Sequence, residues 1–265
     1  VAGTYYEVSF AKDGASVTEI VNAGTYTVIV TGKGLYAGMV VKEFTVAPMT
    51  LVSSNIGAIA DQDFTGEALT PSVTVTINDG AVTLVKGTDY TVEYSNNTNA
   101  GDSTAIVTVT GMGNYGGTPT ATFTIVAKDF SETASVGAIA RGTYSGGAIE
   151  PALTVTDPSK ADALAEGTDY TVSCAADGTV VGNTASLDAD GKPLAAGTYT
   201  VTVKGKGNYG GERTATFVID PLTLPDSTAV TFSEETYTGS ALAPTVTVKI
   251  GDATLGSGDY TVSYA

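Results

Sequence analysis

The stretch "GTDYTV" at Gly87–Val92 recurs unchanged at Gly167–Val172. Two relatives, "GTYYEV" and "SGDYTV", begin at Gly3 and Ser257. A sequence motif that occurs four times in 265 residues indicates a chain built of internal repeats. The same residues alternate polar with β-branched or aromatic side chains, a pattern typical of strands. This phrase therefore predicts a tandem array of β units.

Two further phrases recur in a fixed order around it. One joins an aromatic residue and Gly to a later Pro and a Val/Thr alternation: "FTGEALTPSVTVTI" from Phe64, "YSGGAIEPALTV" from Tyr144 and "YTGSALAPTVTVKI" from Tyr237. The other is rich in glycine: "GKGLYAG" from Gly32, "GMGNYGG" from Gly111 and "GKGNYGG" from Gly205. The ordered set of three phrases defines one repeat.

The spacing of the phrases predicts the domain boundaries. Equivalent positions lie about 80 residues apart in the first full repeat and about 14 more in the second, with the extra residues in Asp177–Gly197. We predict four segments: the second half of a repeat (1–51), a repeat (52–130), a longer repeat (131–224) and the first half of a repeat (225–265). Short links join them, namely "APMTL" (47–51), "AKDFS" (127–131) and "DPLTL" (220–224).

The sequence of each repeat predicts an all-β fold. Apolar residues alternate with Thr in 73–77, 105–110, 121–125 and 199–203, which predicts half-buried antiparallel strands. Turn residues such as Asn78-Asp-Gly80 separate the runs. About seven short strands per repeat favour an immunoglobulin-like sandwich. "AGTYTV" at Ala23 and Ala196 resembles the start of a tyrosine-corner strand, which the repeat 52–130 lacks.

The composition argues against several functional classes. Twelve basic and 28 acidic residues give a formal charge of −16, which disfavours nucleic-acid and membrane-surface partners. No apolar run reaches the roughly 18 residues needed to span a bilayer. The chain has no His and one Cys, so the commonest general base and any internal disulfide are absent. We expect no enzyme, no cofactor and no membrane insertion. The start, without Met or a signal segment, suggests a piece of a longer protein.

Several motifs have both a chemical and a structural interpretation. The sequences at Gly111–Gly116 and Gly205–Gly210 fit G-x-G-x-x-G, but strand-like segments follow where a dinucleotide site needs a helix. Cys174 occupies the register of Phe10, Tyr94 and Tyr264, so we interpret it as core filler rather than a reactive thiol.

The acidic residues also have two interpretations. Asp61-x-Asp63 and Asp188-x-Asp190 could hold Ca²⁺, but neither repeats, and turns explain both. The Asp of the repeated phrase (Asp89, Asp169, Asp259) becomes Tyr5 at the start, so we interpret it as a fold requirement. Lysines do not recur with a matching Asn, so a Lys–Asn isopeptide is not expected. We therefore predict no catalytic, cofactor or metal site residue.

Taken together, "YTG…P…VTV…GTDYTV…NAG…VTVTG.GNYGGT…TFTI" and the "PLTL" link resemble the bacterial Ig-like tandem repeats, of the Big and MBG type, of large cell-surface proteins. The resemblance covers essentially the whole chain. It implies an exported, surface-anchored stalk or adhesin repeat. Members of this group share no active site, so no catalytic residue carries over.

These observations leave three functional hypotheses. The leading one is a spacer that projects a binding region from a bacterial surface, with neighbouring repeats as its partners. The second is a module that binds host glycan or protein, for which the extra loop at Asp177–Gly197 is the place to look. In the third, the halves 225–265 and 1–51 of different copies complete one another and build a fibre.

Overall fold

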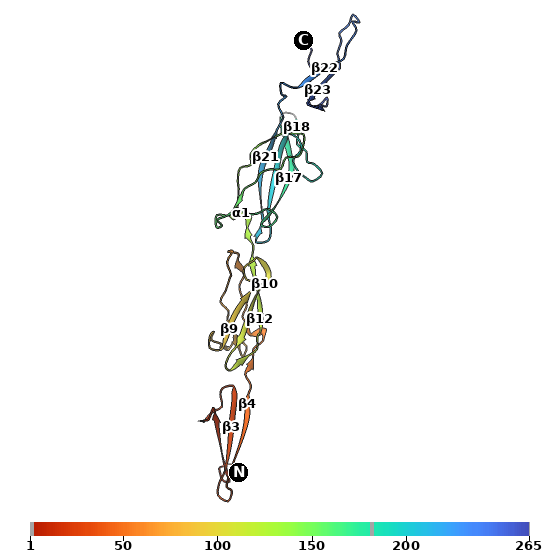
Figure 1. The fold of residues 1–265 in the computed structure, drawn as a ribbon. Helices are drawn as coiled ribbons and strands as arrows, with labels where there is room; N and C mark the ends of the chain where they lie inside the picture. The colour runs from red at the N-terminus through yellow and green to blue at the C-terminus, as the bar shows by residue number, and fades with distance from the viewer. Residues whose placement is uncertain (1–2, 181–182, 265) are drawn as a thin grey trace. The chain divides into compact units, whose positions relative to one another are not determined.

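The computed structural model describes residues 3–180 and 183–264, and its regular secondary structure is almost wholly β-strand (Figure 1). The predicted all-β, Ig-like tandem architecture is confirmed. The described residues contain two short helical turns: the 3₁₀-helix η1 (Ser53–Asn55) and the helix α1 (Phe130–Thr133). No helix among them is long and apolar enough to cross a membrane.

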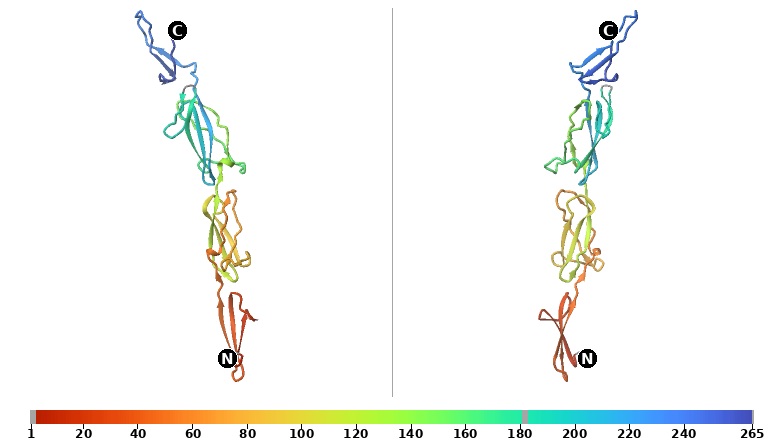
Figure 2. Two further views of the ribbon diagram at one scale, coloured as in Figure 1. Left: turned by 180° about the vertical axis from the view of Figure 1, so that it is seen from behind. Right: turned by 45° about the vertical axis from the view of Figure 1, so that its right-hand side comes forward.

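The chain divides into two compact units. The first contains 1–135, 155–171 and 203–213, and the second contains 136–154, 172–202 and 214–265. Figure 2 shows the strands of each sheet from two further sides. The boundary between the units therefore runs through the repeat 131–224 rather than along a link.

The N-terminal segment forms one antiparallel sheet of order β2-β1-β3-β4. Its strands are β1 (Tyr6–Lys12), β2 (Ala15–Val17), β3 (Gly24–Gly32) and β4 (Met39–Val46). The Tyr26 hydroxyl donates to the Asn22 carbonyl at 2.8 Å, so the predicted tyrosine corner is confirmed here. The Tyr26 ring stacks on Phe44 with centroids 5.7 Å apart.

The repeat 52–130 has a four-stranded sheet of order β6-β12-β10-β9. The strands are β6 (Gln62–Asp63), β9 (Tyr90–Ser95), β10 (Gly101–Gly111) and β12 (Thr120–Val126). A hairpin of β7 (Thr76–Ile77) and β8 (Val82–Thr83) faces it across the core. Its turn contains Asn78, Asp79 and Gly80, all with positive φ, as the Asn-Asp-Gly sequence predicts.

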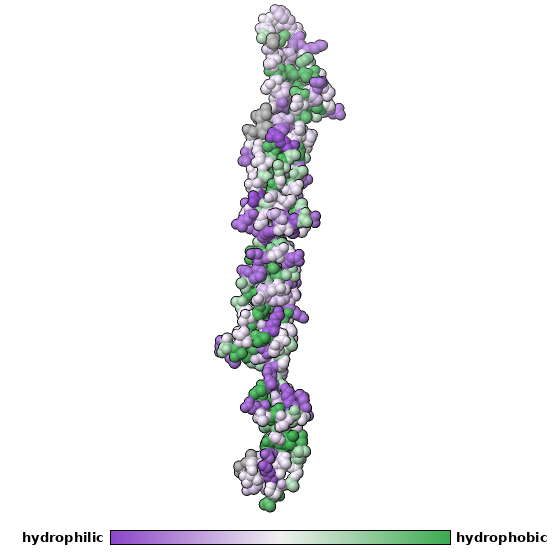
Figure 3. All heavy atoms as spheres, turned by 90° about the vertical axis from the view of Figure 1, so that its left-hand side faces the viewer, coloured by the Kyte–Doolittle hydropathy of each residue, from purple (hydrophilic) through white to green (hydrophobic). Residues whose placement is uncertain are grey.

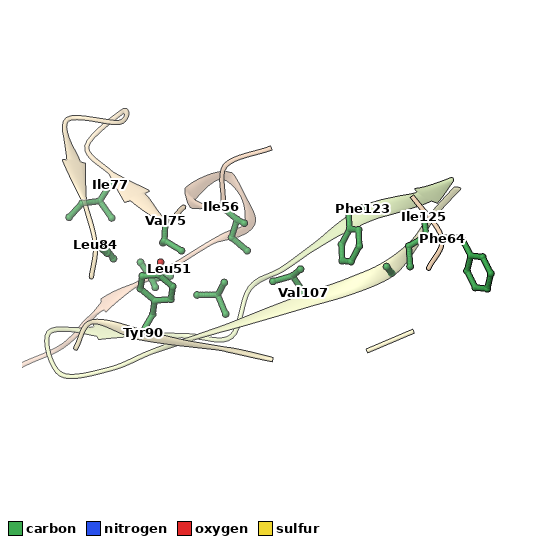
Figure 4. Packing of buried hydrophobic residues seen from close by; sticks show 12 residues of the cluster. Leu51, Ile56, Phe64, Val75, Ile77, Leu84, Tyr90, Val107, Phe123 and Ile125 are labelled. Carbon is green, nitrogen blue, oxygen red and sulfur yellow. The ribbon is translucent and has the colours of Figure 1, made fainter. Parts of the chain in front are cut away.

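The alternation of side chains explains this core (Figure 4). In β10, Ala105, Val107 and Val109 are fully buried, and in β12 Phe123 and Ile125 join them. The intervening Thr residues point away from the cluster because side chains alternate along a strand. The strands expected at 105–110 and 121–125 are therefore confirmed.

The strand expected at 73–77 is largely wrong, since only Thr76–Ile77 belongs to one. Isolated contacts take the place of a continuous ladder here: Val75 forms a single bridge to Ile56, and the Gly57 backbone N–H donates to the Thr74 carbonyl at 2.9 Å. The Tyr94 hydroxyl donates to the Pro71 carbonyl, and the Tyr90 hydroxyl donates to the Val73 carbonyl at 3.1 Å. These hydroxyls satisfy two carbonyls of the segment without a strand partner.

The repeat 131–224 has a five-stranded sheet of order β15-β21-β19-β17-β18. Its strands are β15 (Gly142–Thr143), β17 (Tyr170–Val180), β18 (Asn183–Thr184), β19 (Gly197–Gly205) and β21 (Glu212–Asp220); β14 (Ser135–Val136) and β16 (Val155–Thr156) pair separately. In the second unit, Tyr199, Val201, Phe217 and Ile219 form the core. The Tyr199 hydroxyl donates to the Ala195 carbonyl, a second tyrosine corner.

The C-terminal segment is a three-stranded sheet of β22 (Ala229–Phe232), β23 (Val246–Ile250) and β24 (Ala253–Thr254). It keeps the hydroxyl contacts of the repeat 52–130. Tyr260 donates to the Val246 carbonyl and Tyr264 to the Pro244 carbonyl, both at 2.8 Å. These two contacts match those of Tyr90 and Tyr94 with the Val73 and Pro71 carbonyls.

Candidate functional site

The Asp of the repeated phrase closes a turn in every copy that has it. Its carboxylate accepts a backbone N–H three or four residues earlier, over 2.8–2.9 Å: Val85 to Asp89, Ala165 to Asp169 and Gly256 to Asp259. A carboxylate engaged with its own backbone is typical of turn closure. The interpretation of this Asp as a fold requirement is confirmed.

The backbone of the repeated GTDYTV stretch also accepts a hydrogen bond from the glycine-rich turn. The backbone N–H of Met112 donates to the Asp89 carbonyl at 2.8 Å, and that of Lys206 donates to the Asp169 carbonyl at 2.9 Å. Lys33 makes the same bond to Tyr5, where the Asp is missing. One backbone hydrogen bond therefore joins the two stretches in each of these three copies.

The glycine-rich phrase is a tight turn between strands. It leads from β10 through β11 (Tyr115–Gly116) to β12, with no helix after it, so it lacks the helix N-terminus with which a dinucleotide site holds pyrophosphate. A Cβ at Gly111 would lie 2.7 Å from the backbone nitrogen of Gly116, and Gly113 has φ +63°. The close approach of the backbone explains the glycine at 111, and the positive φ explains the glycine at 113.

Two of the three links, 47–51 and 127–131, pair with the glycine-rich turn that follows. Strand β5 (Met49–Thr50) runs parallel to β11, and β13 (Lys128–Asp129) runs parallel to β20 (Tyr209–Gly210). The backbone N–H groups of Met49 and Lys128 donate to the carbonyls of Asn114 and Asn208, each at 2.9 Å. The sequence predicts the links but not these contacts, because backbone groups make them and the side chains of Met49 and Lys128 have no chemistry in common.

Beside the second link lies the most unusual polar cluster of the described chain. Asp157 is 1% exposed, and both of its oxygens accept from the Lys128 ammonium at 2.9 and 2.7 Å. The backbone N–H and hydroxyl of Ser159 donate to it at 2.9 and 2.8 Å, and the Tyr209 hydroxyl at 3.1 Å. Asp157 is the only buried charged residue among those the structure describes, and these donors compensate for its burial.

The cluster sets the protonation of its members. Burial alone would raise the pKa of Asp157, but the bonds from Lys128, Ser159 and Tyr209 outweigh it and bring the pKa to about 2. Burial and the bond to Asp157 raise the pKa of the Tyr209 phenol well above its usual range. The cluster is therefore an ionised acid held by a cation and a neutral phenol.

This depressed pKa predicts a dependence of stability on pH. Asp157 stabilises the fold above its unfolded pKa of about 4, and the stabilisation is lost as pH falls towards its folded pKa of about 2. The loss should be roughly 2 kcal/mol. Urea unfolding should show this loss: between pH 5 and 2 the free energy of unfolding of the natural chain should fall more than that of a Lys128→Met/Asp157→Ile variant. Parallel pH curves for the two chains would contradict it.

The acidic pairs considered for calcium lie in turns and strands. The Asp188 carboxylate accepts from the backbone N–H groups of Asp190 and Lys192 at 3.0 and 2.8 Å, which closes a turn. Asp63 ends β6, and Asp61 immediately precedes it. Within 3–180 and 183–264, no group of three or more His, Cys, Asp or Glu side chains is placed to hold a metal ion.

Cys174 lies half-buried against the core of the second unit. In the repeat alignment it takes the position of Tyr94 and Tyr264, which donate to a Pro carbonyl, and its packing agrees with the interpretation as a core residue. Burial, with a smaller effect of Glu150, raises the pKa of its thiol.

Because the thiolate is the nucleophile, Cys174 should react with a disulfide reagent more slowly than a free cysteine at pH 8. We expect a reduction of roughly tenfold or more for the folded chain. In urea the rate should recover to that of free cysteine, which is the internal control. Equal rates in the folded and unfolded chain would contradict the prediction.

Two features of the second unit could receive a ligand. A groove of about 240 Å³ is lined by Tyr144, Ala195, Leu222, Leu224, Ile250 and Leu255, among others. In the predicted loop Asp177–Gly197, Lys192 reaches Glu150 at 3.4 Å, while residues 181–182 lie outside the described chain.

Comparison with known proteins gives no family. No family model matches the chain, and no curated protein matches it. Among solved structures, the chain is similar to a protocadherin gammaB7 EC3-6 cis-dimer, with 12% identity, TM-score 0.28, and coverage of 89% of this chain and 70% of that one.

Two further structures belong to other groups. Sidekick-1 immunoglobulin domains 1-4 show 11% identity and TM-score 0.19, over 87% of this chain and 68% of that one. SGBP-B of the Bacteroides ovatus mixed-linkage glucan utilization locus, in complex with a mixed-linkage heptasaccharide, shows 14% identity and TM-score 0.16, over 88% and 63%. Likenesses of this strength carry no argument about function. The chain's own sheets and repeated contacts show that it is an all-β tandem of Ig-like domains.

Proposed function

We propose that this chain is a spacer segment of a bacterial cell-surface adhesin, exported and without catalytic activity. The observation that carries the proposal is the pairing of the links 47–51 and 127–131 with the glycine-rich turns that follow them. A link that is hydrogen-bonded along its backbone leaves less freedom than an unpaired one. Tandem repeats with separate cores, a charge of −16 and the resemblance to Big and MBG repeats agree with it.

Mechanical unfolding of single 265-residue chains tests the spacer role. We expect separate rupture events for the repeats 52–130 and 131–224, because each has its own core. Each event should release on the order of 25–30 nm, since an extended residue spans about 3.5 Å. A chain that extends smoothly, without ruptures, could not serve as a spacer under tension.

A binding module for host glycan or protein is the second candidate, supported by the groove at Tyr144 and Leu224 and by the long loop. Glycan and matrix-protein arrays should be probed with the natural chain and with a variant whose 177–197 loop is shortened. Binding that disappears with the loop would establish this function instead of a spacer. Binding that survives the deletion would exclude the loop as the site.

Exposed apolar side chains support the third candidate, assembly through the half-repeats. In the N-terminal sheet Met39, Val40 and Val41 are 65%, 57% and 47% exposed, and in the C-terminal sheet Phe232 is 68% exposed. Apolar residues also reach the face shown in Figure 3 in small groups. Sedimentation over a range of concentrations should show a growing species that a Val41→Lys/Phe232→Lys variant lacks. A constant monomer would exclude assembly.

A further inference from the structure

The Asn of the glycine-rich turn makes a two-sided contact with the preceding repeat. The side-chain oxygen of Asn114 accepts from the backbone N–H of Ala23 at 2.8 Å. Its amide nitrogen donates to the side-chain oxygen of Asn22 at 2.9 Å. The Asn-Ala-Gly turn (22–24) thus offers one donor and one acceptor, and an Asn side chain supplies the complement of both.

The same contact occurs one repeat later. The side-chain oxygen of Asn208 accepts from the backbone N–H of Ala100 at 2.7 Å, and its amide nitrogen donates to the side-chain oxygen of Asn99 at 3.2 Å. All residues of both contacts belong to the first compact unit. Two independent occurrences with the same atoms show that the geometry is built into the repeat.

The backbone of this Asn is also engaged. Its carbonyl accepts from the link, as the bonds from Met49 to Asn114 and from Lys128 to Asn208 show. Beside Asn208, the Tyr209 ring meets Phe64 of the preceding repeat edge to face, with centroids 6.1 Å apart. One residue therefore connects its own turn, the link and the previous repeat.

We propose that the Asn-Ala-Gly turn (22–24 and 99–101) is a docking surface whose partner is the Gly-x-Gly-Asn-Tyr-Gly turn of the following repeat. The pair couples neighbouring repeats and distinguishes copies that carry both asparagines from those that do not. Leu35 takes the Asn position in the first turn, and Ala195-Ala196-Gly197 takes the place of Asn-Ala-Gly in the repeat 131–224. This holds whether or not the chain is a spacer.

Amide hydrogen exchange of the full chain by NMR tests the pair residue by residue. Asn208→Ala should speed exchange of the Ala100 amide roughly tenfold, because a hydrogen bond is lost. Asn208→Asp keeps the acceptor, so Ala100 should stay protected. The Ala23 amide, which bonds to Asn114, should not change in either variant.

Two controls separate docking from folding. Leu35→Ala changes the same turn position at a 97% exposed side chain, and should alter neither Ala23 nor Ala100. The Val201 amide reports the core of the repeat 131–224 and should keep its natural rate in Asn208→Ala. Rapid exchange of Ala100 in the natural chain, or no change in Asn208→Ala, would overturn the proposal. Equal acceleration of Val201 and Ala100 would do so too, because it would mean that Asn208 acts on the fold and not on docking.

Discussion

Asp157→Ala is expected to destabilise the repeat 131–224 by on the order of 3 kcal/mol. Removal of the carboxylate leaves the Lys128 ammonium, 22% exposed, without its counter-charge and the Tyr209 hydroxyl without its acceptor. An unpaired buried charge is among the costliest single defects in a fold. The partial exposure of Lys128 places the effect at the lower end of that range, because the ammonium can move towards water.

The equivalent positions in the repeat 52–130 suggest how to remove the pair without this cost. Met49 lies opposite Tyr115 as Lys128 lies opposite Tyr209, and Ile77 takes the sequence position of Asp157. Lys128→Met/Asp157→Ile should therefore be neutral, or stabilising by about 1–4 kcal/mol, as an apolar replacement of a buried ion pair often is.

Hydrogen exchange with mass spectrometry on the full chain separates the repeats and measures both variants. Peptides from 131–224 should report the change, while those from the core of 52–130 serve as an internal control. Asp162→Ala, at an exposed Asp of the same repeat, is the matched control variant. The ion-pair explanation is wrong if Asp157→Ala behaves like Asp162→Ala, or if the double variant is as unstable as the single one.

This cluster marks the limit of what the sequence predicts. Periodicity predicts the strands because alternate residues of β10 and β12, namely Ala105, Val107, Val109, Phe123 and Ile125, face one core. The register of Cys174 with Tyr94 and Tyr264 follows from repeat alignment alone. By contrast, Lys128 and Asp157 are 29 residues apart, and their substitution for Met49 and Ile77 becomes visible as a pair only when the structure places them in contact.

The candidate site was less predictable than the fold, for a physical reason. Backbone atoms make the link-to-turn bonds of Met49 and Lys128, and a backbone bond places little demand on residue type. The strand expected at 73–77 is mostly absent although its residues alternate, since Val75 makes only a single bridge to Ile56 and the Tyr90 hydroxyl donates to the Val73 carbonyl. Period-2 patterns cannot distinguish a ladder from such side-chain partners.

Gly205→Ala should cost about 3 kcal/mol, the upper end of the range for forced overpacking. A Cβ at Gly205 would lie 2.8 Å from the Gly210 carbonyl oxygen and 2.8 Å from the Tyr209 carbonyl carbon. Both contacts are backbone atoms of the turn, so no side-chain rotation relieves them. The turn must open, which weakens the bond from Gly205 to Gly211 and moves Tyr209 away from Asp157.

A graded series tests whether the close approach is the cause. Gly147→Ala meets no atom within 4 Å and has no positive φ, so it should be neutral or slightly stabilising. Gly207→Ala has φ +65° and its Cβ would lie 3.5 Å from the Thr168 carbonyl oxygen, so about 1 kcal/mol is expected. Urea unfolding of the full chain should rank the losses Gly205, Gly207, Gly147. If Gly207→Ala costs as much as Gly205→Ala, backbone conformation rather than crowding governs the turn, and the first glycine of the motif is not the one that closes it.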